Sequence, residues 1–598
     1  MPSSLLSRRD LEFLLYEWLD VEALTKRERY AEHGRDTFDD ALALAERLAT
    51  ELYAPHRRRA DDEEPHVVDG HVVLPPEVAV AVKAYGESGF VGATIDAEHG
   101  GMQLPAVIAE ACTAWFQAAN APTASYSMLS TGNAHLLLAQ GTPEQIATWA
   151  QPVLEGRWTG TMCLSEPHAG SSLSDLTTRA EPQPDGSYRI FGTKMWISGG
   201  DHELTDNIVH LVLARVPGAP AGTRGLSLFI VPKVLLDDAG ELGERNDVVL
   251  AGLNHKMGWR GTTNCVLGFG EGVHTPGGAP GAVGYLVGAE GAGLAGMFHM
   301  MNGARIGVGL GATALGYAGY LASLDYARSR PQGRPIAAKD PSSAQVPIVE
   351  HADVRRMLLA QKAYVEGGLA FGLWCGRLLD DQVSADDPAE RERAGLLLDV
   401  LTPIAKSWPS QWCLAANDLA IQVMGGAGYT RDHLVELLYR DNRLNPIHEG
   451  THGIQALDLL GRKVIMQGGA GLRALLRLIG ETAARGHAAG GAAATHAVAL
   501  EAAAARVAAT TAQVWSTGDP SLALANATAY LEAVGHVVLA WVWLEQELVA
   551  VDRDGSFYAG KRAAAQYFYA HELPKVGPQL DLLDALDRTV LDTDPAWL

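Results

Sequence analysis

Apolar residues recur at helical spacing near the start of the chain. The spacing i, i+3, i+4, i+7, i+8 predicts an amphipathic helix within residues 1–37, whose apolar stripe has to dock on another surface. The stripe consists of Leu11, Leu14, Leu15, Trp18 and Leu19. Similar periodicity continues over residues 38–158, where Gly89 and Gly141 are expected to end helices. The sequence therefore predicts a helical domain preceded by a short helical extension.

Residues 159–286 show a different pattern, made of short alternating or β-branched runs. Gly, Pro and Asp residues separate these runs at the spacing typical of an all-β domain. The clearest runs are SYRIFGTKMWISGG, NIVHLVLARV, GLSLFIVPKV and NCVLGFGEGV. We therefore predict a β domain in the middle of the chain.

Helical periodicity returns in long segments over residues 287–467. Residues 468–598 are Ala-rich and helical, with a Gly-rich hinge at GHAAGGAAATH. The late apolar stretch 533–551 carries His536, Glu545 and Glu547, which favours a buried helix over a membrane span. The predicted plan is a multidomain α+β protein with boundaries at 1–37, 38–158, 159–286, 287–467 and 468–598.

Charge and cysteine content narrow the class of protein. The 598 residues carry a formal net charge of −23, and an acidic surface repels nucleic-acid backbones. Five cysteines without a CxxC pair suit a reducing cytoplasm and argue against a zinc site built from cysteines. Glu12, Glu17 and Asp20 interrupt the first apolar stretch, which a signal peptide would not tolerate. We expect a cytoplasmic protein without a membrane span.

One short motif is compatible with a metal site. The string HEGTH at residues 448–452 fits HExxH, the zinc-protease signature, whose two histidines must lie one turn apart on a helix. Pro446 precedes the string and Gly450 lies inside it, and both residues are poor helix formers. We therefore expect no metal, with the zinc site as an alternative that a helix through the string would support.

Glycines at residues 307–316 offer a second weak motif. A dinucleotide fingerprint needs a strand immediately before its glycines. This stretch instead follows the helical-looking segment MFHMMNGARIG. Close packing between helices is the better interpretation of these glycines.

Three longer motifs are more specific. They are MCLSEPHAGSSLSDLTTRA with FGTKMWISGG (162–200), RIGVGLGATALGYAGYLASLDYARSRPQGRPI (305–336) and IQVMGGAGYTRDHLVELLYRDNRLNPIHEGTHGIQALDLLGRKV (421–464). In this order the chain resembles an acyl-CoA dehydrogenase over residues 40–465. The long C-terminal region and the YARSRPQGR string resemble the larger subgroup related to 3-methylmercaptopropionyl-CoA dehydrogenase. The resemblance implies an N-terminal helical domain, a middle β-barrel, a C-terminal four-helix bundle and an extra C-terminal helical domain.

The resemblance also implies a reaction. An FAD-dependent enzyme of this family converts an acyl-CoA thioester to the trans-2-enoyl-CoA, as in the β-oxidation of fatty acids. By the match to the family's EGT string, Glu449 would remove the α-proton while hydride passes to flavin N5. A glutamate of ordinary pKa is a weak base for this step, so burial is expected to raise the pKa of Glu449. Without the resemblance, Glu449 would be interpreted as a helix-start acid.

Further site residues follow from the same resemblance. The substrate residues implied are Ser171, Asn302, Arg305 and Gly450, although Gly170-Ser171-Ser172 departs from the family's GSD. The implied FAD contacts are Met162, Leu164, Ser165, Trp196, Ile197 and Ser198, with Thr451 at the adenosine diphosphate end. Those to a neighbouring subunit's FAD are Arg330, Gln332, Gln422, Gly425 and Gly426. As alternatives, Trp196 is a barrel core residue, and the arginines and glycines serve ion pairs and helix packing.

A shared FAD site implies an oligomer, and the extra C-terminal domain favours a homodimer. Electrons would pass to an electron-transfer flavoprotein. Two other flavin-dependent functions remain open, an acyl-CoA oxidase and a DNA-protecting relative of the family. The region from Gly468 onward has 9 basic and 14 acidic residues, which argues against DNA binding. Candidate substrates are 3-methylmercaptopropionyl-CoA and fatty acyl-CoAs of short, medium or long chain.

Overall fold

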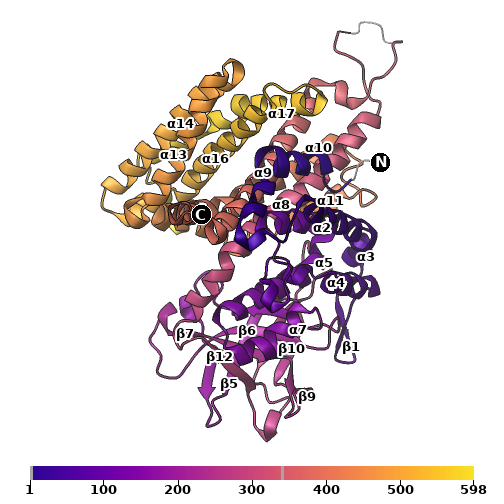
Figure 1. Cartoon of the computed structure of the whole chain (residues 1–598), viewed down its shortest axis with the longest axis vertical. Helices are drawn as coiled ribbons and strands as arrows, with labels where there is room; N and C mark the ends of the chain where they lie inside the picture. Colours follow the sequence, from indigo (N-terminus) through magenta and orange to yellow (C-terminus); the bar gives the residue numbers. More distant parts are fainter. Residues whose placement is uncertain (1–3, 338–341) are drawn as a thin grey trace. The chain divides into compact units, whose positions relative to one another are not determined.

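The chain folds into two compact units, each assembled from separate stretches of sequence. The computed structural model describes residues 4–337 and 342–598, without the side chains of residues 298–302 (Figure 1). Unit 1 comprises Met1–Phe38, Pro105–Ala118 and Arg305–Leu598, and unit 2 comprises Asp39–Leu104 and Ala119–Ala304. Two long helices, α5 (Ala106–Gln140) and α8 (Gly293–Ser329), contribute residues to both units.

Unit 2 contains the predicted β-barrel. Strands pair in the order β5–β12–β7–β6, and β4 pairs with both β6 and β5, so these five strands form a closed ring. Strand β3 adds to β6, while β11 and then β10 add to β5. The strands are β3 (Thr159–Cys163), β4 (Arg179–Pro182), β5 (Tyr188–Ser198), β6 (Ile208–Arg215), β7 (Leu226–Pro232), β10 (Val248–Leu253), β11 (Asn264–Phe269) and β12 (Ala282–Val287).

Inward-facing side chains of these strands fill the barrel. The interior cluster includes Ile190, Ile197 and Phe229, all nearly inaccessible to solvent. On β3 and β6, the side chain of Asn133 from α5 reaches the carbonyls of Thr161 and Val209 at 3.2 and 2.8 Å. Helix α5 therefore fixes these two strands from outside the barrel.

The helical prediction for residues 38–158 is largely confirmed. Helices α2 (Arg35–Leu48), α3 (Arg57–Asp62), α4 (Pro76–Glu87) and α5 occupy it, and Gly89 follows α4 with φ +81°. A hairpin of β1 (His66–Val68) and β2 (His71–Val73) interrupts the helices and was not predicted. Its strands are too short to show alternation, and the turn residues Asp69 and Gly70 both have positive φ.

Unit 1 contains the bundle formed by α8, α9 (Ala352–Ser384), α10 (Pro388–Met424), α11 (Val435–Asn442) and α12 (His452–Asp458). The glycines at 307–316 lie inside α8. A Cβ on Gly309 would come within 1.8 Å of the Ala405 carbonyl on α10, and one on Gly316 within 2.9 Å of Cys413. The helix-packing interpretation is therefore confirmed at Gly309 and Gly316, where α8 and α10 approach too closely for a side chain.

The C-terminal region is a separate set of helices, α13 (Ala470–Ala489), α14 (Gly491–Ser516), α16 (Ala527–Ala550), α17 (Ser556–Tyr567) and α18 (Val576–Asp584). Figure 1 shows α13, α14 and α16 side by side. The predicted hinge is a tight turn at Gly490 and Gly491. Among the described helices, α16 alone has the length and apolarity of a membrane span, but 83% of its apolar window is buried inside the protein. The predicted buried helix is confirmed.

The N-terminal extension docks on these C-terminal helices. It forms α1 (Arg8–Glu12) and a π-helical segment, η1 (Phe13–Trp18). Phe13 packs edge-to-face on Phe557 with ring centroids 5.4 Å apart, and Trp18 Nε1 donates to Glu545 at 3.3 Å. The predicted docking of the amphipathic stripe is confirmed.

A cluster of buried charges stabilises the docking of the N-terminal extension. Lys561 of α17 has no solvent exposure; it pairs with Asp10 and, at 2.8 Å, with Glu366 of α9. Its ammonium also donates to Gln546 at 2.9 Å. Removing one member of a buried ion cluster leaves uncompensated charge, which costs about 3–5 kcal/mol.

We therefore expect Lys561→Met to lower the free energy of unfolding of unit 1 by about 3–5 kcal/mol, because two buried carboxylates lose a counter-charge. Thermal and urea unfolding of the whole chain measure this loss. The control is Lys83→Met, which removes an exposed lysine and should change stability by less than about 1 kcal/mol. Equal shifts for the two variants would contradict the prediction.

Candidate active site

The turn between α11 and α12 has an unusual backbone. Glu449 has φ +52° and Gly450 has φ +86°, so two successive residues are left-handed. The Glu449 carbonyl accepts from Gln455 Nε2 at 2.9 Å, and Thr451 caps α12 by accepting from the N–H of Ile454. Helix α12 starts only at His452, so the HEGTH string is not one helix. The zinc-protease alternative is therefore wrong.

A chain of buried asparagines connects this turn to the bundle. Asn442 donates to Asn417 of α10 at 2.7 Å, and Asn445 donates to Asn442 at 2.8 Å. His448, directly before Glu449, contacts the same Asn445 side chain at 3.0 Å. Asn417 and Asn442 also donate to main-chain carbonyls of α8, each at 3.0 Å. Since buried amides need partners, these bonds specify how α8, α10 and α11 meet below the turn.

Charged groups surround the Glu449 carboxylate. Burial raises its pKa, and the positive charges of Arg305 and Lys406 offset only part of that increase. Arg305 of α8 is itself paired with Asp458 at 2.9 Å. Burial and the Lys406 charge lower the pKa of His448 to about 3, so this histidine is neutral near pH 7. The arrangement provides a carboxylate that is more basic than an ordinary glutamate.

In unit 2, the motifs at 162–165 and 196–198 come together. The N–H of Met195 on β5 donates to the Ser165 carbonyl at 3.0 Å, just after β3 ends. The register between β5 and β11 shifts across residues 195–196, which places an extra residue in β5. Such a bulge re-aims a side chain. Trp196 is left-handed, with φ +66°, and its side chain is 57% exposed.

This exposure excludes the alternative of Trp196 as a barrel core residue. Ile197 points inward instead and is 2% exposed, so only its main chain remains for a ligand. Ser198 accepts from Asn264 of β11 at 3.3 Å. Met162, Leu164, Ser165 and Ser198 are partly buried.

A buried ion pair beneath these motifs was missed by the sequence analysis. Lys194 donates to the Leu164 carbonyl at 2.9 Å and pairs with Glu166 at 3.1 Å. Glu166 also accepts from the N–H and hydroxyl groups of Thr177 and Thr178. Burial alone would raise the pKa of Glu166, but Lys194 and these donors hold it at about 2. The sequence feature that could have revealed this pair is Lys194 itself, an ionisable side chain at an inward position of β5.

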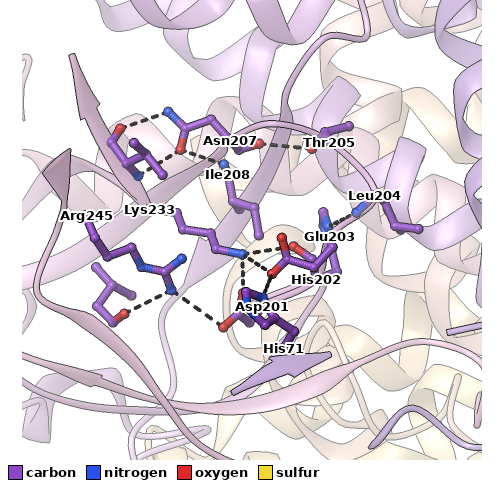
Figure 2. Close-up of polar contacts among 12 residues, drawn as sticks. His71, Asp201, His202, Glu203, Leu204, Thr205, Asn207, Ile208, Lys233 and Arg245 are labelled. Atoms are coloured by element: carbon purple, nitrogen blue, oxygen red, sulfur yellow. Dashed lines mark hydrogen bonds and ion pairs between the residues drawn. The ribbon is translucent and has the colours of Figure 1, made fainter. Parts of the chain in front are cut away.

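A second group of ion pairs fixes the chain that follows β5 (Figure 2). Lys233 pairs with Asp201 at 2.6 Å and with Glu203 at 3.1 Å, and it donates to the His202 carbonyl at 2.9 Å. Arg245 reaches the other oxygen of Asp201 at 3.7 Å. Segment 201–203 is thereby held from two directions, which keeps the end of β5 in place.

The remaining predicted residues lie elsewhere. Ser171 is exposed on the loop after β3, and Gln422, Gly425 and Gly426 are exposed at the end of α10. Arg330 and Gln332 are exposed after α8, where the Gln332 carbonyl accepts from His351 at 2.7 Å. The side chain of Asn302 lies outside the described residues. Within unit 1 the fold brings Arg305, Glu449, Gly450 and Thr451 to one place, and the roles of all these residues stay predictions.

Comparison with known families gives four consecutive matches. The acyl-CoA dehydrogenase N-terminal domain matches residues 36–157, the middle domain 161–270 and the C-terminal domain 291–465. A further domain, described as acetyl-CoA dehydrogenase C-terminal like, matches residues 475–594. These matches follow the order of the helical, β and helical regions described above.

Individual relatives are similar over nearly their whole lengths. The 3-methylmercaptopropionyl-CoA dehydrogenase of Ruegeria pomeroyi is 38% identical, covering 94% of both chains. The broad-specificity linear acyl-CoA dehydrogenase FadE5 of Mycobacterium tuberculosis is 34% identical, covering 98% of both. An acyl-CoA dehydrogenase from Bacillus anthracis, solved in complex with FAD, has the same fold, with a TM-score of 0.71 at 18% identity over 94% of this chain and 93% of that one. The chain belongs to the acyl-CoA dehydrogenase family of FAD-dependent oxidoreductases.

Proposed function

We propose that this protein oxidises an acyl-CoA thioester to the trans-2-enoyl-CoA and that Glu449 is the catalytic base. The observation that carries the proposal is the turn at Glu449, a partly buried carboxylate of raised pKa on a left-handed backbone braced by three helices. A strained residue held by its surroundings is typical of a catalytic position.

The chain's own residues act on the substrate's α-carbon. Glu449 removes the α-proton as a carboxylate, and its raised pKa makes it a better acceptor for that proton. The main-chain N–H of Glu449 is proposed to bind the thioester oxygen, which acidifies the α-proton. The neighbouring Gly450 adopts φ +86° without strain, which lets the chain turn directly after Glu449.

The described residues fit an FAD. Trp196 presents an exposed indole beside the Ser165 main chain, a suitable surface for a planar ring. In unit 1, a Cβ on Gly425 or Gly426 would meet nothing within 4 Å, so a phosphate group could approach that backbone. When bound, FAD supplies the acceptor for the hydride that leaves the β-carbon.

We further propose a cytoplasmic homodimer that passes electrons to an electron-transfer flavoprotein. All five cysteines are unpaired and buried, as suits a reducing compartment. The exposed Arg330 and Gln332 support a role toward a second subunit, since an arginine fork suits a diphosphate.

For the substrate, we propose a short linear acyl-CoA, including 3-methylmercaptopropionyl-CoA. The two relatives are named for that thioester and for linear acyl-CoAs. Replacing the thioether sulfur by a methylene gives the pentanoyl chain, and such volume-conserving exchanges are well tolerated in apolar sites. One pocket can therefore accept both.

Glu449→Gln is expected to retain FAD but to reduce anaerobic bleaching of the flavin band by acyl-CoA by about a thousandfold or more, because the proton acceptor is lost. Stopped-flow absorbance of the purified protein measures this rate. The control is Glu481→Gln, at an exposed position of α13, whose flavin should bleach at the wild-type rate. Rapid bleaching by Glu449→Gln would refute the proposed base.

Gly450→Ala and Gly453→Ala form a matched pair three residues apart. A Cβ on Gly450 would lie 2.6 Å from Gln455 Nε2 on a backbone with φ +86°, whereas Gly453 has open space in α12. We expect Gly450→Ala to lose about 1–2 kcal/mol of stability and most of its activity. Gly453→Ala should gain about 0.5–1 kcal/mol. Thermal unfolding and steady-state kinetics check both, and equal behaviour would contradict the described backbone.

A substrate panel tests the proposed acyl chain. We expect 3-methylmercaptopropionyl-CoA and pentanoyl-CoA to give kcat/KM values within about tenfold of each other, because the two chains are nearly isosteric. Palmitoyl-CoA should be poorer than both. Turnover of pentanoyl-CoA without turnover of the sulfur compound would refute the shared pocket, and stoichiometric oxygen consumption would identify an oxidase instead.

A further inference from the structure

Lys406 is a fully buried lysine that the reaction described above does not use. It lies in the middle of α10 within an apolar run, and its side chain has no solvent exposure. Gly309 of α8 packs against the carbonyl of the preceding residue, Ala405. The contact between α8 and α10 therefore fixes the backbone from which this lysine extends.

The Lys406 ammonium binds both sides of the Glu449 turn. It donates to the Asn445 carbonyl at 2.7 Å and to the Gly450 carbonyl at 2.7 Å. These carbonyls lie four residues before and one residue after Glu449. Glu449 would relax from its left-handed conformation without such restraints, because L-residues disfavour this conformation.

Lys406 also carries a charge that acts on the Glu449 carboxylate. Arg305 approaches from α8, but Asp458 of α12 already pairs with it. His448 is neutral near pH 7, since its pKa is about 3. Burial lowers the pKa of Lys406 itself to about 7, with Glu449 acting to raise it and Arg305 to lower it. Below that pH its positive charge acts on Glu449; above it, the neutral amine still has two N–H donors for the two carbonyls.

We propose that Lys406 is the positioning residue of the catalytic glutamate, holding the main chain on both sides of Glu449 and placing a positive charge beside its carboxylate. The inference rests on the proposed function, because it presupposes that Glu449 is the base. It assigns Lys406 an effect on the chemical step and on its pH dependence, beyond an effect on stability.

Two Lys406 variants separate its two contributions. Lys406→Met removes the charge and the donors, whereas Lys406→Gln removes the charge but keeps an amide donor. The control is Lys463→Met, another buried lysine of unit 1, whose partner is Asp399. Each holoenzyme is assayed for FAD content, thermal unfolding and the pH profiles of kcat and KM with pentanoyl-CoA, alongside Glu449→Gln.

For Lys406→Met we expect kcat at pH 7 to fall about tenfold or more with KM nearly unchanged. The acid limb of the kcat–pH profile of this variant should move to higher pH by about one unit or more. The reason is that Glu449 loses a nearby positive charge, which raises its pKa. Lys406→Gln should show the same shift with a smaller loss of kcat. Lys463→Met should lose stability without a shift of the acid limb.

The outcomes distinguish the two proposals. Bleaching by Glu449→Gln at the wild-type rate would remove the proposed base. An inactive Glu449→Gln together with wild-type pH profiles for both Lys406 variants would overturn the positioning role alone. Failure of both Lys406 variants to fold with FAD would assign the lysine a structural role and also overturn it.

Discussion

The candidate active site in unit 1 depends on neighbouring helices that hold Glu449 in a left-handed backbone conformation. At Glu449 this conformation costs about 1–2 kcal/mol, and the turn cannot supply that stability by itself. The asparagine chain through Asn442 and Asn445, together with Lys406, supplies it from neighbouring helices. Because each of these polar groups is buried, helices packed in another register would leave them unpaired. The position of one reactive side chain is thus coupled to how whole helices pack.

In unit 2, buried polar groups likewise hold a left-handed residue in place, here on strand β5. A strand bulge places Trp196 in a left-handed conformation, and the surrounding main chain is held by lysines. Lys194 binds the carbonyl of Leu164, and Lys233 binds that of His202, while each also pairs with a carboxylate. An ammonium has three donors, so one lysine can satisfy a carboxylate and fix a loop together. Both units use buried lysines to shape the segments that carry their site residues.

The sequence allowed prediction wherever a pattern extends over many residues. The alternation around Ile190 and Phe229 indicated a β domain, and the stripe at Leu11 and Leu14 indicated a docking helix, whereas the barrel was expected from the family resemblance. Glu449 was identified through resemblance, since nothing local separates it from a helix-start acid. Lys194 and Lys406 were missed because a lone lysine in an apolar run does not show which carbonyl it will meet. The hairpin at residues 66–73 was missed because its strands have only three residues each.

The docking of the N-terminal extension has a consequence for synthesis of the protein. Trp18 is synthesised 527 residues before Glu545, its hydrogen-bond partner, and Phe13 likewise precedes Phe557, on which it packs. Unit 2 ends at Ala304 and contains its own barrel, so it can complete its contacts while translation continues. Unit 1 cannot, and its first helix exposes apolar residues throughout elongation. The apolar face of residues 8–18 therefore lacks its docking surface for a long interval of synthesis, whose length is set by the sequence separation of that contact.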